Sequence, residues 1–331
     1  MRTQPRKHHP MPYRSLPLML RTTLQAVALV FCLAAVANAA AGPLRDRLGR
    51  SAAASEMEDS EGRSAGAWAL QALPPGLRLL RDVAYGPNAQ QRMDIYVPDR
   101  VQAAPVLFLV HGGGWRRGDK AHDRLVQNKL AHWAAQGVVL VSVNYRMLPE
   151  ARPDAQARDV ALALSHAQQQ AHRWGGDARR FVLMGHSAGA HLVSLLAVSP
   201  ERLRATGAQP VLGTVALDSG AMDVEQTMEE RHAPLFDKAF GSDPAYWRSV
   251  SPQHQWQPGA APMLAVCSSL RRSPCPQARA FAARGEALGA RVTVLPQPLS
   301  HGDVNETLGL PGPYTAAVDS FLRTLPGWTL P

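Results

Sequence analysis

The chain has 331 residues, of which 46% are hydrophobic and 18% charged, the composition of a globular protein with a sizeable core. The formal net charge of +9 at pH 7 suggests a nucleic-acid or membrane partner, but residues 1–39 alone carry five basic and no acidic side chains. The small positive excess over the rest of the chain is typical of an ordinary solvated surface, so we expect no nucleic-acid partner.

Residues 1–39 have the pattern of a secretory signal peptide. Basic residues up to Arg21 are followed by an apolar stretch over 24–36 and then by Ala37-Asn38-Ala39, a small-residue cleavage sequence. The apolar stretch is too short to favour a permanent transmembrane helix. We therefore expect an exported protein, periplasmic or secreted, with no membrane span in its mature form.

Residues 40–78 lack clear periodicity and predict a linker, and residues 79–331 predict one catalytic domain. Apolar runs at 83–86 and 92–97 predict an antiparallel hairpin. Beyond it, expected strands at 105–110, 137–143, 180–184, 211–217, 262–267 and 291–295 alternate with expected helices at 122–135, 153–174, 188–197, 276–289 and 313–325. This alternation predicts an α/β fold with a mostly parallel central sheet and helices on both faces.

The interval 224–260 breaks the alternation and predicts a cap or insertion over the carboxyl edge of the sheet. Its aromatic residues either line a substrate pocket or form a small satellite core. The sequence leaves both interpretations open, and it leaves open whether the interval moves as a lid.

Two cysteines remain once the leader is removed. Cys267 and Cys275 stand eight residues apart, and an even pair in an exported protein predicts a disulfide. Two thiols with no histidine nearby are a poor metal site, so we expect neither a metal nor another cofactor.

The segment Gly185-His186-Ser187-Ala188-Gly189 has the G-x-S-x-G pattern of a nucleophile elbow. It lies between the expected strand 180–184 and the expected helix 188–197. A serine on a strained turn between strand and helix presents its hydroxyl at the edge of the sheet, and the flanking glycines leave room for the turn. We therefore expect Ser187 to be the catalytic nucleophile.

A second glycine-rich segment, His111-Gly112-Gly113-Gly114-Trp115, directly follows the expected strand 105–110. A serine nucleophile needs backbone N–H groups that stabilise the developing oxyanion. The amides of Gly113 and Gly114, together with the amide of Ala188 after the nucleophile, are the expected oxyanion hole.

The general base is expected late in the chain, since enzymes with such a strand–turn–helix elbow have their catalytic residues in the order serine, acid, histidine. His301 follows the last expected strand, 291–295, where a loop returns to the serine. His186 and His191 flank the elbow, where packing or local hydrogen bonding is the more common role.

The acid that orients the histidine is the hardest catalytic residue to identify. It usually lies in the loop after the penultimate strand, and that loop contains no carboxylate here. Asp218, which follows the strand at 211–217, is the best substitute, because neighbouring parallel strands end at the same edge. Asp223 is the second choice. In a third alternative no acid is used, and Ser268, Ser269 or a backbone carbonyl orients the histidine.

The chain resembles the α/β-hydrolase superfamily in four segments: HGGGWRRGDK at 111–120, NYR at 144–146, GGD at 175–177 and GHSAGAHL at 185–192. Within it, they resemble the exported esterase branch related to hormone-sensitive-lipase-like carboxylesterases, bacterial feruloyl-esterase-like enzymes and kynurenine formamidases. The resemblance covers roughly residues 80–325. It implies the roles given above to Ser187, His301 and the three amides, and the missing carboxylate departs from its pattern.

These observations predict an exported serine carboxylesterase that hydrolyses a small-molecule ester through an acyl-serine intermediate. One alternative is an amide or formamide hydrolase of the kynurenine-formamidase type. Another is a binding protein that keeps the hydrolase fold with an impaired triad. Oligomeric state and the acyl and alcohol specificity are not readable from the sequence.

Overall fold

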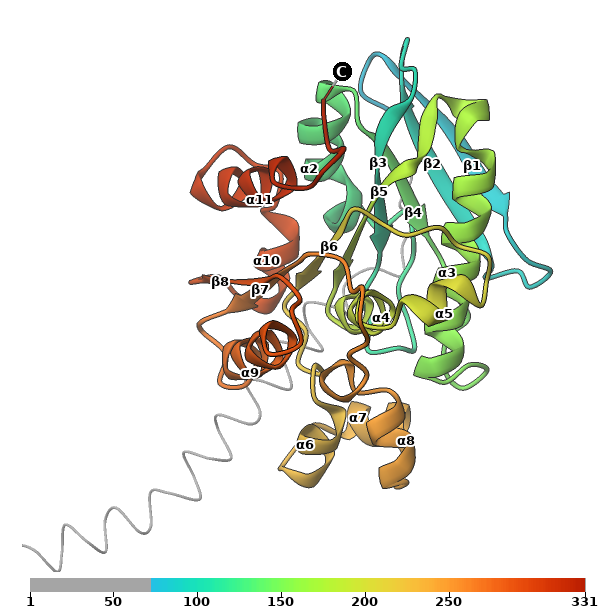
Figure 1. The fold of residues 1–331 in the computed structure, drawn as a ribbon. Coiled ribbons are helices and arrows are strands. Elements are labelled where there is room, and N and C mark those ends of the chain that lie inside the picture. Colours follow the sequence, from blue (N-terminus) through green and yellow to red (C-terminus); the bar gives the residue numbers. More distant parts are fainter. Residues whose placement is uncertain (1–72, 331) are drawn as a thin grey trace, which may run out of the picture. The chain divides into compact units, whose positions relative to one another are not determined.

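The computed structural model describes residues 73–330 (Figure 1). The expected signal peptide and most of the expected linker lie outside the described residues. The first strand begins at Leu77, two residues before the boundary expected for the catalytic domain. Within residues 73–330, no helix combines the length and the apolar character that a membrane crossing requires.

Eight strands form one sheet in the order β1-β2-β4-β3-β5-β6-β7-β8. Their bounds are β1 Leu77–Ala84, β2 Arg92–Pro98, β3 Ala104–Val110, β4 Val139–Val143, β5 Gly176–His186, β6 Gly213–Leu217, β7 Met263–Ser268 and β8 Val292–Gln297. The β2 strand is antiparallel to β1 and to β4, and all other pairs are parallel. The expected hairpin and the mostly parallel sheet are thus confirmed.

Helices cover both faces of the sheet (Figure 1). Their bounds are α2 Asp123–Trp133, α3 Pro153–Gln170, α4 Ala188–Ala197, α5 Pro200–Arg204, α6 Val224–Glu229, α7 Pro234–Phe240, α8 Pro244–Ser249, α9 Pro274–Glu286, α10 His301–Glu306 and α11 Pro313–Arg323, with short 3₁₀ turns at Ala134–Gln136, Ala171–Trp174 and Pro252–His254. The sequence predicts the long helices, but not the short α5 and α10.

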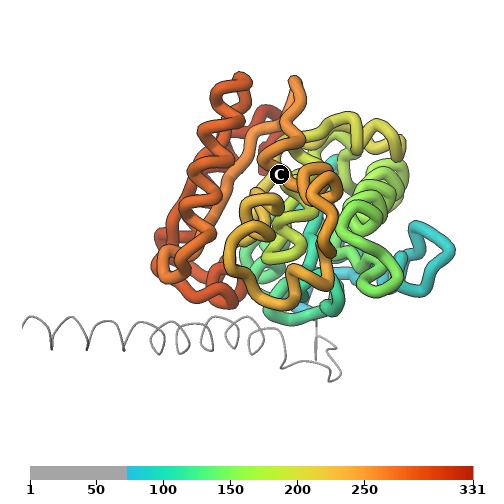
Figure 2. The backbone as a smooth tube through the Cα atoms, turned by 90° about the horizontal axis from the view of Figure 1, so that it is seen from below, coloured from blue at the N-terminus to red at the C-terminus, as the bar shows by residue number. Residues whose placement is uncertain are grey.

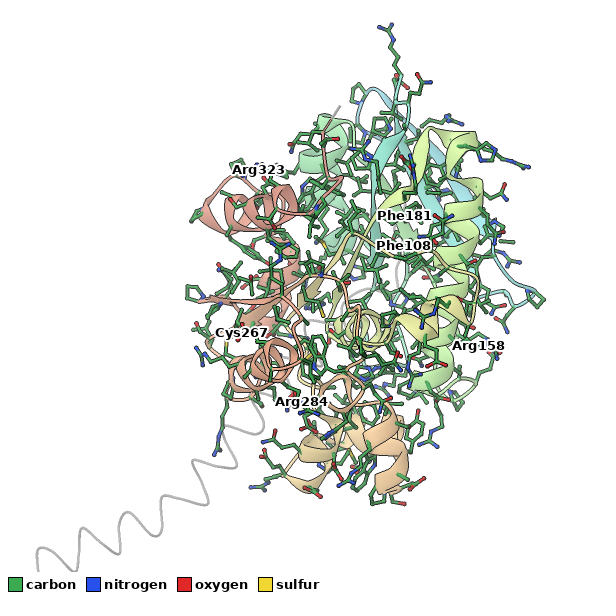
Figure 3. All side chains as sticks on the ribbon, in the orientation of Figure 1. Phe108, Arg158, Phe181, Cys267, Arg284 and Arg323 are labelled. Carbon is green, nitrogen blue, oxygen red and sulfur yellow. A yellow bond between two sulfur atoms is a disulfide. The ribbon has the colours of Figure 1, made fainter. Side chains whose placement is uncertain are left out.

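The two faces follow from the alternation of side chains along each strand. On β3, Phe108 belongs to a core that includes residues of α3 and α4, whereas Leu107 belongs to a separate core with α2 and α11. Both residues are fully buried. Figure 3 shows Phe108 and Phe181, on the neighbouring strands β3 and β5, among the densely packed side chains in the middle of the molecule. Strands buried on both faces explain the uninterrupted apolar runs of the sequence.

The interval expected as an insertion folds into the three short helices α6, α7 and α8, which gather at one end of the molecule (Figure 1). Figure 2, viewed from that end, shows this gold segment across the middle, between the green and the orange-red parts of the chain. Side chains of Asp223 and Asp243 cap α6 and α8, and prolines begin α7 and α8. We call residues 219–256 the cap; this segment begins five residues before the expected interval 224–260 and ends four residues before its end.

Candidate active site

Ser187 occupies the sharp turn between β5 and α4, with φ 55° and ψ −118°. This conformation is strained for a residue with a side chain, and such strain is found at nucleophile elbows. A Cβ on Gly185 would lie 2.4 Å from the carbonyl oxygen of Gly189, and one on Gly189 would lie 2.2 Å from that of Val110. Glycine is therefore required on both sides of the turn. The amide of Ser187 donates to Leu217 at the end of β6, 3.0 Å away.

His301 lies within hydrogen-bonding distance of the serine. Its Nε2 is 2.9 Å from Ser187 Oγ, and its Nδ1 is 2.7 Å from Asp218 Oδ2. In the tautomer that satisfies both contacts, Nδ1–H donates to the carboxylate and Nε2 accepts from the hydroxyl. The structure thus brings together the three side chains expected as nucleophile, base and acid.

The position of His301 is fixed from two sides. It begins α10, where the hydroxyl oxygen of Ser300 accepts from the amide of Asp303. Burial, together with the neighbouring His301, holds the pKa of His186 well below its ordinary value, so that ring is neutral at pH 7. Nε2 of His186 lies 2.8 Å from the carbonyl oxygen of His301 and donates to it. His186 therefore holds the backbone that carries the base.

Asp218 follows β6 and is fully buried. Its Oδ1 accepts from the amide of Ser268 at 2.7 Å, and its Oδ2 accepts from both His301 and Arg271, each at 2.7 Å. Nδ1 of His301 and Nη1 of Arg271 are 2.9 Å apart. Because both are donors, they converge on the shared oxygen rather than bond to each other.

Burial alone would raise the pKa of the Asp218 carboxyl. The hydrogen bond from His301 and the charges of His301 and Arg271 outweigh burial and hold that pKa well below its usual range. Asp218 is therefore ionised at neutral pH and accepts the hydrogen bond from Nδ1–H of His301.

The other candidates for the acid have different partners. Asp223 caps α6, where its side chain accepts from the amide of Gln226 at 3.0 Å. The hydroxyl of Ser268 donates to the carbonyl of Leu299, and that of Ser269 donates to the carbonyl of Gln297.

Only part of the expected oxyanion loop lies at the pocket that contains the nucleophile. Gly114 and Ala188 line the same pocket as Ser187. Gly113 is not among the lining residues, and its carbonyl accepts from the amides of Arg116 and Arg117 in the turn that carries Gly114.

Trp115, the next residue, has φ 60° and connects this loop to α4 and to the cap. Its indole N–H donates to Nδ1 of His191 at 3.2 Å, and Nε2–H of His191 donates to the carbonyl of Val250 at 2.7 Å. Burial lowers the pKa of His191 to about 4, so the neutral ring can accept at one nitrogen and donate at the other. The ring of Trp115 also packs against Phe236 and Phe240, with centroids 5.7 and 4.8 Å away.

The pocket has a volume of about 320 Å³, including the open space at its mouth. Its lining residues are Gly114, Trp115, Ser187, Ala188, Ser219, Gly220, Leu235, Phe236, Arg271 and His301. The cap aromatics Phe236 and Phe240 belong to the same core as residues of α3 and α4, rather than to a separate satellite core. Phe236 lines the pocket, whereas Tyr246 and Trp247 bond elsewhere, to Asp154 and to the carbonyl of Gly241.

Cys267 and Cys275 form a disulfide with their Cα atoms 5.1 Å apart. The bond joins the end of β7 to the start of α9, beside which Figure 3 marks Cys267. The enclosed loop carries Arg271, a residue that the sequence interpretation missed. The available signal was two arginines in the loop where a carboxylate was expected. Among residues 73–330, no group of three or more His, Cys, Asp or Glu side chains is arranged to hold a metal.

The chain is similar to proteins named as esterases. Esterase LipC of Mycobacterium tuberculosis is 28% identical over 226 residues, which are 63% of this chain and 55% of that protein. A probable isoprenylcysteine alpha-carbonyl methylesterase ICME of Oryza sativa subsp. japonica is 28% identical over 161 residues, 47% of this chain and 38% of that protein. The chain thus spans about half or less of the length of these relatives.

Solved structures share the fold. Esterase B from Lactobacillus Rhamnosis superposes with a TM-score of 0.63 at 19% identity, over 86% of this chain and 94% of that chain. Thermogutta terrifontis esterase 2, in a form phosphoramylated by tabun, gives a TM-score of 0.61 at 20% identity, over 80% of this chain and 99% of that chain. These likenesses confirm the α/β-hydrolase fold.

The family model BD-FAE matches residues 93–267, which is more than half of the chain and includes the oxyanion loop, the elbow and Asp218. The chain therefore belongs to the BD-FAE family of α/β-hydrolase esterases.

Proposed function

We propose that this protein is an exported serine carboxylesterase that works through an acyl-serine intermediate. The observation that carries the proposal is the hydrogen-bonded chain from Ser187 through His301 to Asp218, which opens onto a pocket. Membership of an esterase family supports the reaction class.

The geometry suggests the order of events. Nε2 of His301 takes the hydroxyl proton as Ser187 Oγ attacks the ester carbonyl, and Asp218 stabilises the imidazolium that results. Amides of Gly114 and Ala188, with Gly113 in the same turn, stabilise the negative carbonyl oxygen. The imidazolium then protonates the departing alcohol. Water, deprotonated by His301, attacks the acyl-serine and releases the acid and the free enzyme.

The reaction class is tested by steady-state kinetics with p-nitrophenyl acetate and butyrate. We expect Ser187→Ala to abolish turnover, and Ser320→Ala, on the exposed side of α11, to leave it unchanged. A fluorophosphonate probe should label the wild type at Ser187 and not the Ser187→Ala variant. Esterase activity retained by Ser187→Ala would overturn the assignment. Lack of labelling and of turnover in the wild type would favour a binding protein.

The same machinery cleaves N-formyl groups, so N-formylkynurenine should be assayed beside the short esters. A higher kcat/KM for N-formylkynurenine would assign a formamide hydrolase instead.

Export rests on the leader pattern of residues 1–39 and is supported by the disulfide. When all 331 residues are expressed, cell fractionation should find the protein outside the cytoplasm, with its first 39 or so residues removed. Recovery of the uncut chain in the cytoplasm would contradict export.

A further inference from the structure

Arg271 lies between the triad acid and the substrate pocket. Its Nη1 donates to Asp218 Oδ2 at 2.7 Å, and the residue also lines the pocket beside Ser187. The side chain of Asp218 is 0% exposed, whereas that of Arg271 is 21% exposed. The guanidinium thus extends from a buried carboxylate to an accessible wall of the pocket.

The far side of this guanidinium faces the cap. A side chain at Gly220 would have its Cβ 3.8 Å from Nη2 of Arg271 and 4.0 Å from the ring of Phe236. Arg271 and Phe236 therefore flank the same glycine on the pocket wall. A planar guanidinium and an aromatic ring at one wall can receive a flat, polar substituent of a substrate.

The anchoring of Asp218 does not depend on Arg271 alone. Oδ1 accepts from the amide of Ser268, and Oδ2 accepts from His301, so each carboxylate oxygen has a partner besides the arginine. The contribution particular to Arg271 is a guanidinium that pairs with Asp218 and also lines the pocket.

This charge is distinctive among the lining residues. Besides His301, which works as the base, the lining consists of glycines, alanine, serines and apolar side chains, and Arg271 is its one permanently charged member. A substrate in the pocket therefore meets a cationic fork in largely apolar surroundings, where a charge-assisted bond to a carboxylate is stronger than in water.

We propose that Arg271 is a specificity-determining residue that binds a carboxylate group of the substrate, so that the enzyme prefers esters bearing a negative charge near the scissile bond. The proposal rests on the esterase function proposed above. The disulfide loop, in this view, carries a recognition residue into the site from the position where a triad acid was expected.

The test uses two pairs of esters in which a carboxylate is exchanged for its neutral carboxamide, so that each compound has one ester bond. For the alcohol side the pair is 4-acetoxybenzoate and 4-acetoxybenzamide, and for the acyl side it is the 4-nitrophenyl monoester of glutaric acid and the corresponding monoamide. We expect the wild type to favour the anionic member of at least one pair by about ten- to a hundredfold in kcat/KM, mainly through KM. That preference should shrink as NaCl rises from 20 to 500 mM.

The variants isolate the arginine. Arg271→Gln should abolish the anionic preference, and Arg271→Lys should restore part of it, since lysine keeps the charge without the fork. Arg272→Gln is the matched control, because it removes the same charge from the adjacent, exposed position of the loop and should keep the preference.

Two results would overturn the proposal while leaving the esterase assignment intact. One is a wild type that hydrolyses the neutral esters and shows no anionic preference at low salt. The other is an Arg271→Gln variant in which kcat falls equally for both members of a pair and their ratio is unchanged, since that describes a residue acting only through Asp218. Failure of the wild type on all four esters would overturn the esterase assignment and the proposal together. If Arg271→Gln does not fold, the wild-type preference and its salt dependence decide.

Discussion

Replacement of Asp218 by asparagine tests the assignment of the acid most directly. The change keeps the shape of the side chain and removes its charge and one acceptor. In the wild type, Oδ1 accepts from Ser268 and Oδ2 accepts from His301 and Arg271. An amide can turn its oxygen to one of these sides only, so its NH₂ group must face an N–H donor on the other.

The expected magnitude follows from these contacts. A hydrogen bond to a charged group contributes about 1.5–3 kcal/mol, and the variant loses the charged acceptor of the bonds from His301 and Arg271. The carboxylate also stabilises the imidazolium of the transition state. A loss of about 4–5.5 kcal/mol corresponds to a drop in kcat of roughly 10³- to 10⁴-fold. KM should change little, because Asp218 is fully buried and does not line the pocket.

The assay is p-nitrophenyl butyrate hydrolysis at saturating substrate, with thermal unfolding measured to show that the variant folds. Asp223→Asn is the control, since Asp223 caps α6 and asparagine caps helices about as well as aspartate. We expect that control to stay within about threefold of the wild type. A folded Asp218→Asn variant within tenfold of the wild type, or an Asp223→Asn variant as impaired as Asp218→Asn, would refute the reasoning.

Three further predictions concern residues around the triad. Replacing Cys267 and Cys275 together by alanine should lower the free energy of unfolding by about 2–3 kcal/mol, which is the chain-entropy value for so short a loop. Equal free energies of unfolding for the wild type and the double variant, measured by chemical denaturation without reductant, would contradict this. His186→Leu removes the donor to the carbonyl of His301 and should lower kcat about tenfold with KM nearly constant, whereas an unchanged kcat would show that this contact does not position the base. Burial lowers the pKa of Lys129 to about 7 in the folded protein. Between pH 7 and the higher pKa of this lysine in the unfolded chain, the unfolded chain binds more protons than the folded one, so the free energy of unfolding rises with pH. Lys129→Met should remove about 3 kcal/mol of that rise between pH 7 and pH 9.5, measured by chemical denaturation, and an unaltered slope would contradict it.

The control for the lysine prediction is Lys238→Met, which removes an exposed lysine from α7 and should leave the pH dependence of unfolding as it is in the wild type.

The sheet was predictable because its strands are buried on both faces. Runs such as 105–110 are continuously apolar, and β3 spans Ala104–Val110. Strand order was not readable from the sequence, because the pairing of β3 with both β4 and β5 is decided by packing between distant segments. The short helix α10 was missed for another reason. Its six residues are too few for a periodic pattern, and tertiary contacts such as that of His186 hold its first residue.

The nucleophile and the base were predictable because their constraints are local. The elbow needs glycines at fixed spacing around Ser187, and the position of His301 follows from chain order after the last strand. The sequence predicted the cap only as an interval that interrupts the alternation of strands and helices. The packing of α7 against Trp115 decides which of the cap aromatics lines the pocket. The local sequence around Phe236 does not predict that contact.

The acid could be ranked from the sequence but not settled, because its environment comes from a neighbouring strand. Asp218 has φ 55°, a backbone conformation that is uncommon for residues other than glycine, although aspartate adopts it more often than most. Its amide donates to Val266 on β7, and its side chain accepts from Ser268 at the end of the same strand. The residue that follows β6 is therefore held in place by β7.

This dependence explains why the loop after β7 contains no carboxylate. Asp218 sits at the end of the strand adjacent to β7, within reach of the loop that β7 begins. A second carboxylate there would repel the first and raise its pKa, which would weaken the acid as a partner of the histidine. Donors are needed instead, and the loop provides the amide of Ser268 and the guanidinium of Arg271. Because the acid lies one strand earlier, after β6, the loop after β7 has to supply hydrogen-bond donors and a positive charge to it, and a carboxylate in that loop would work against it.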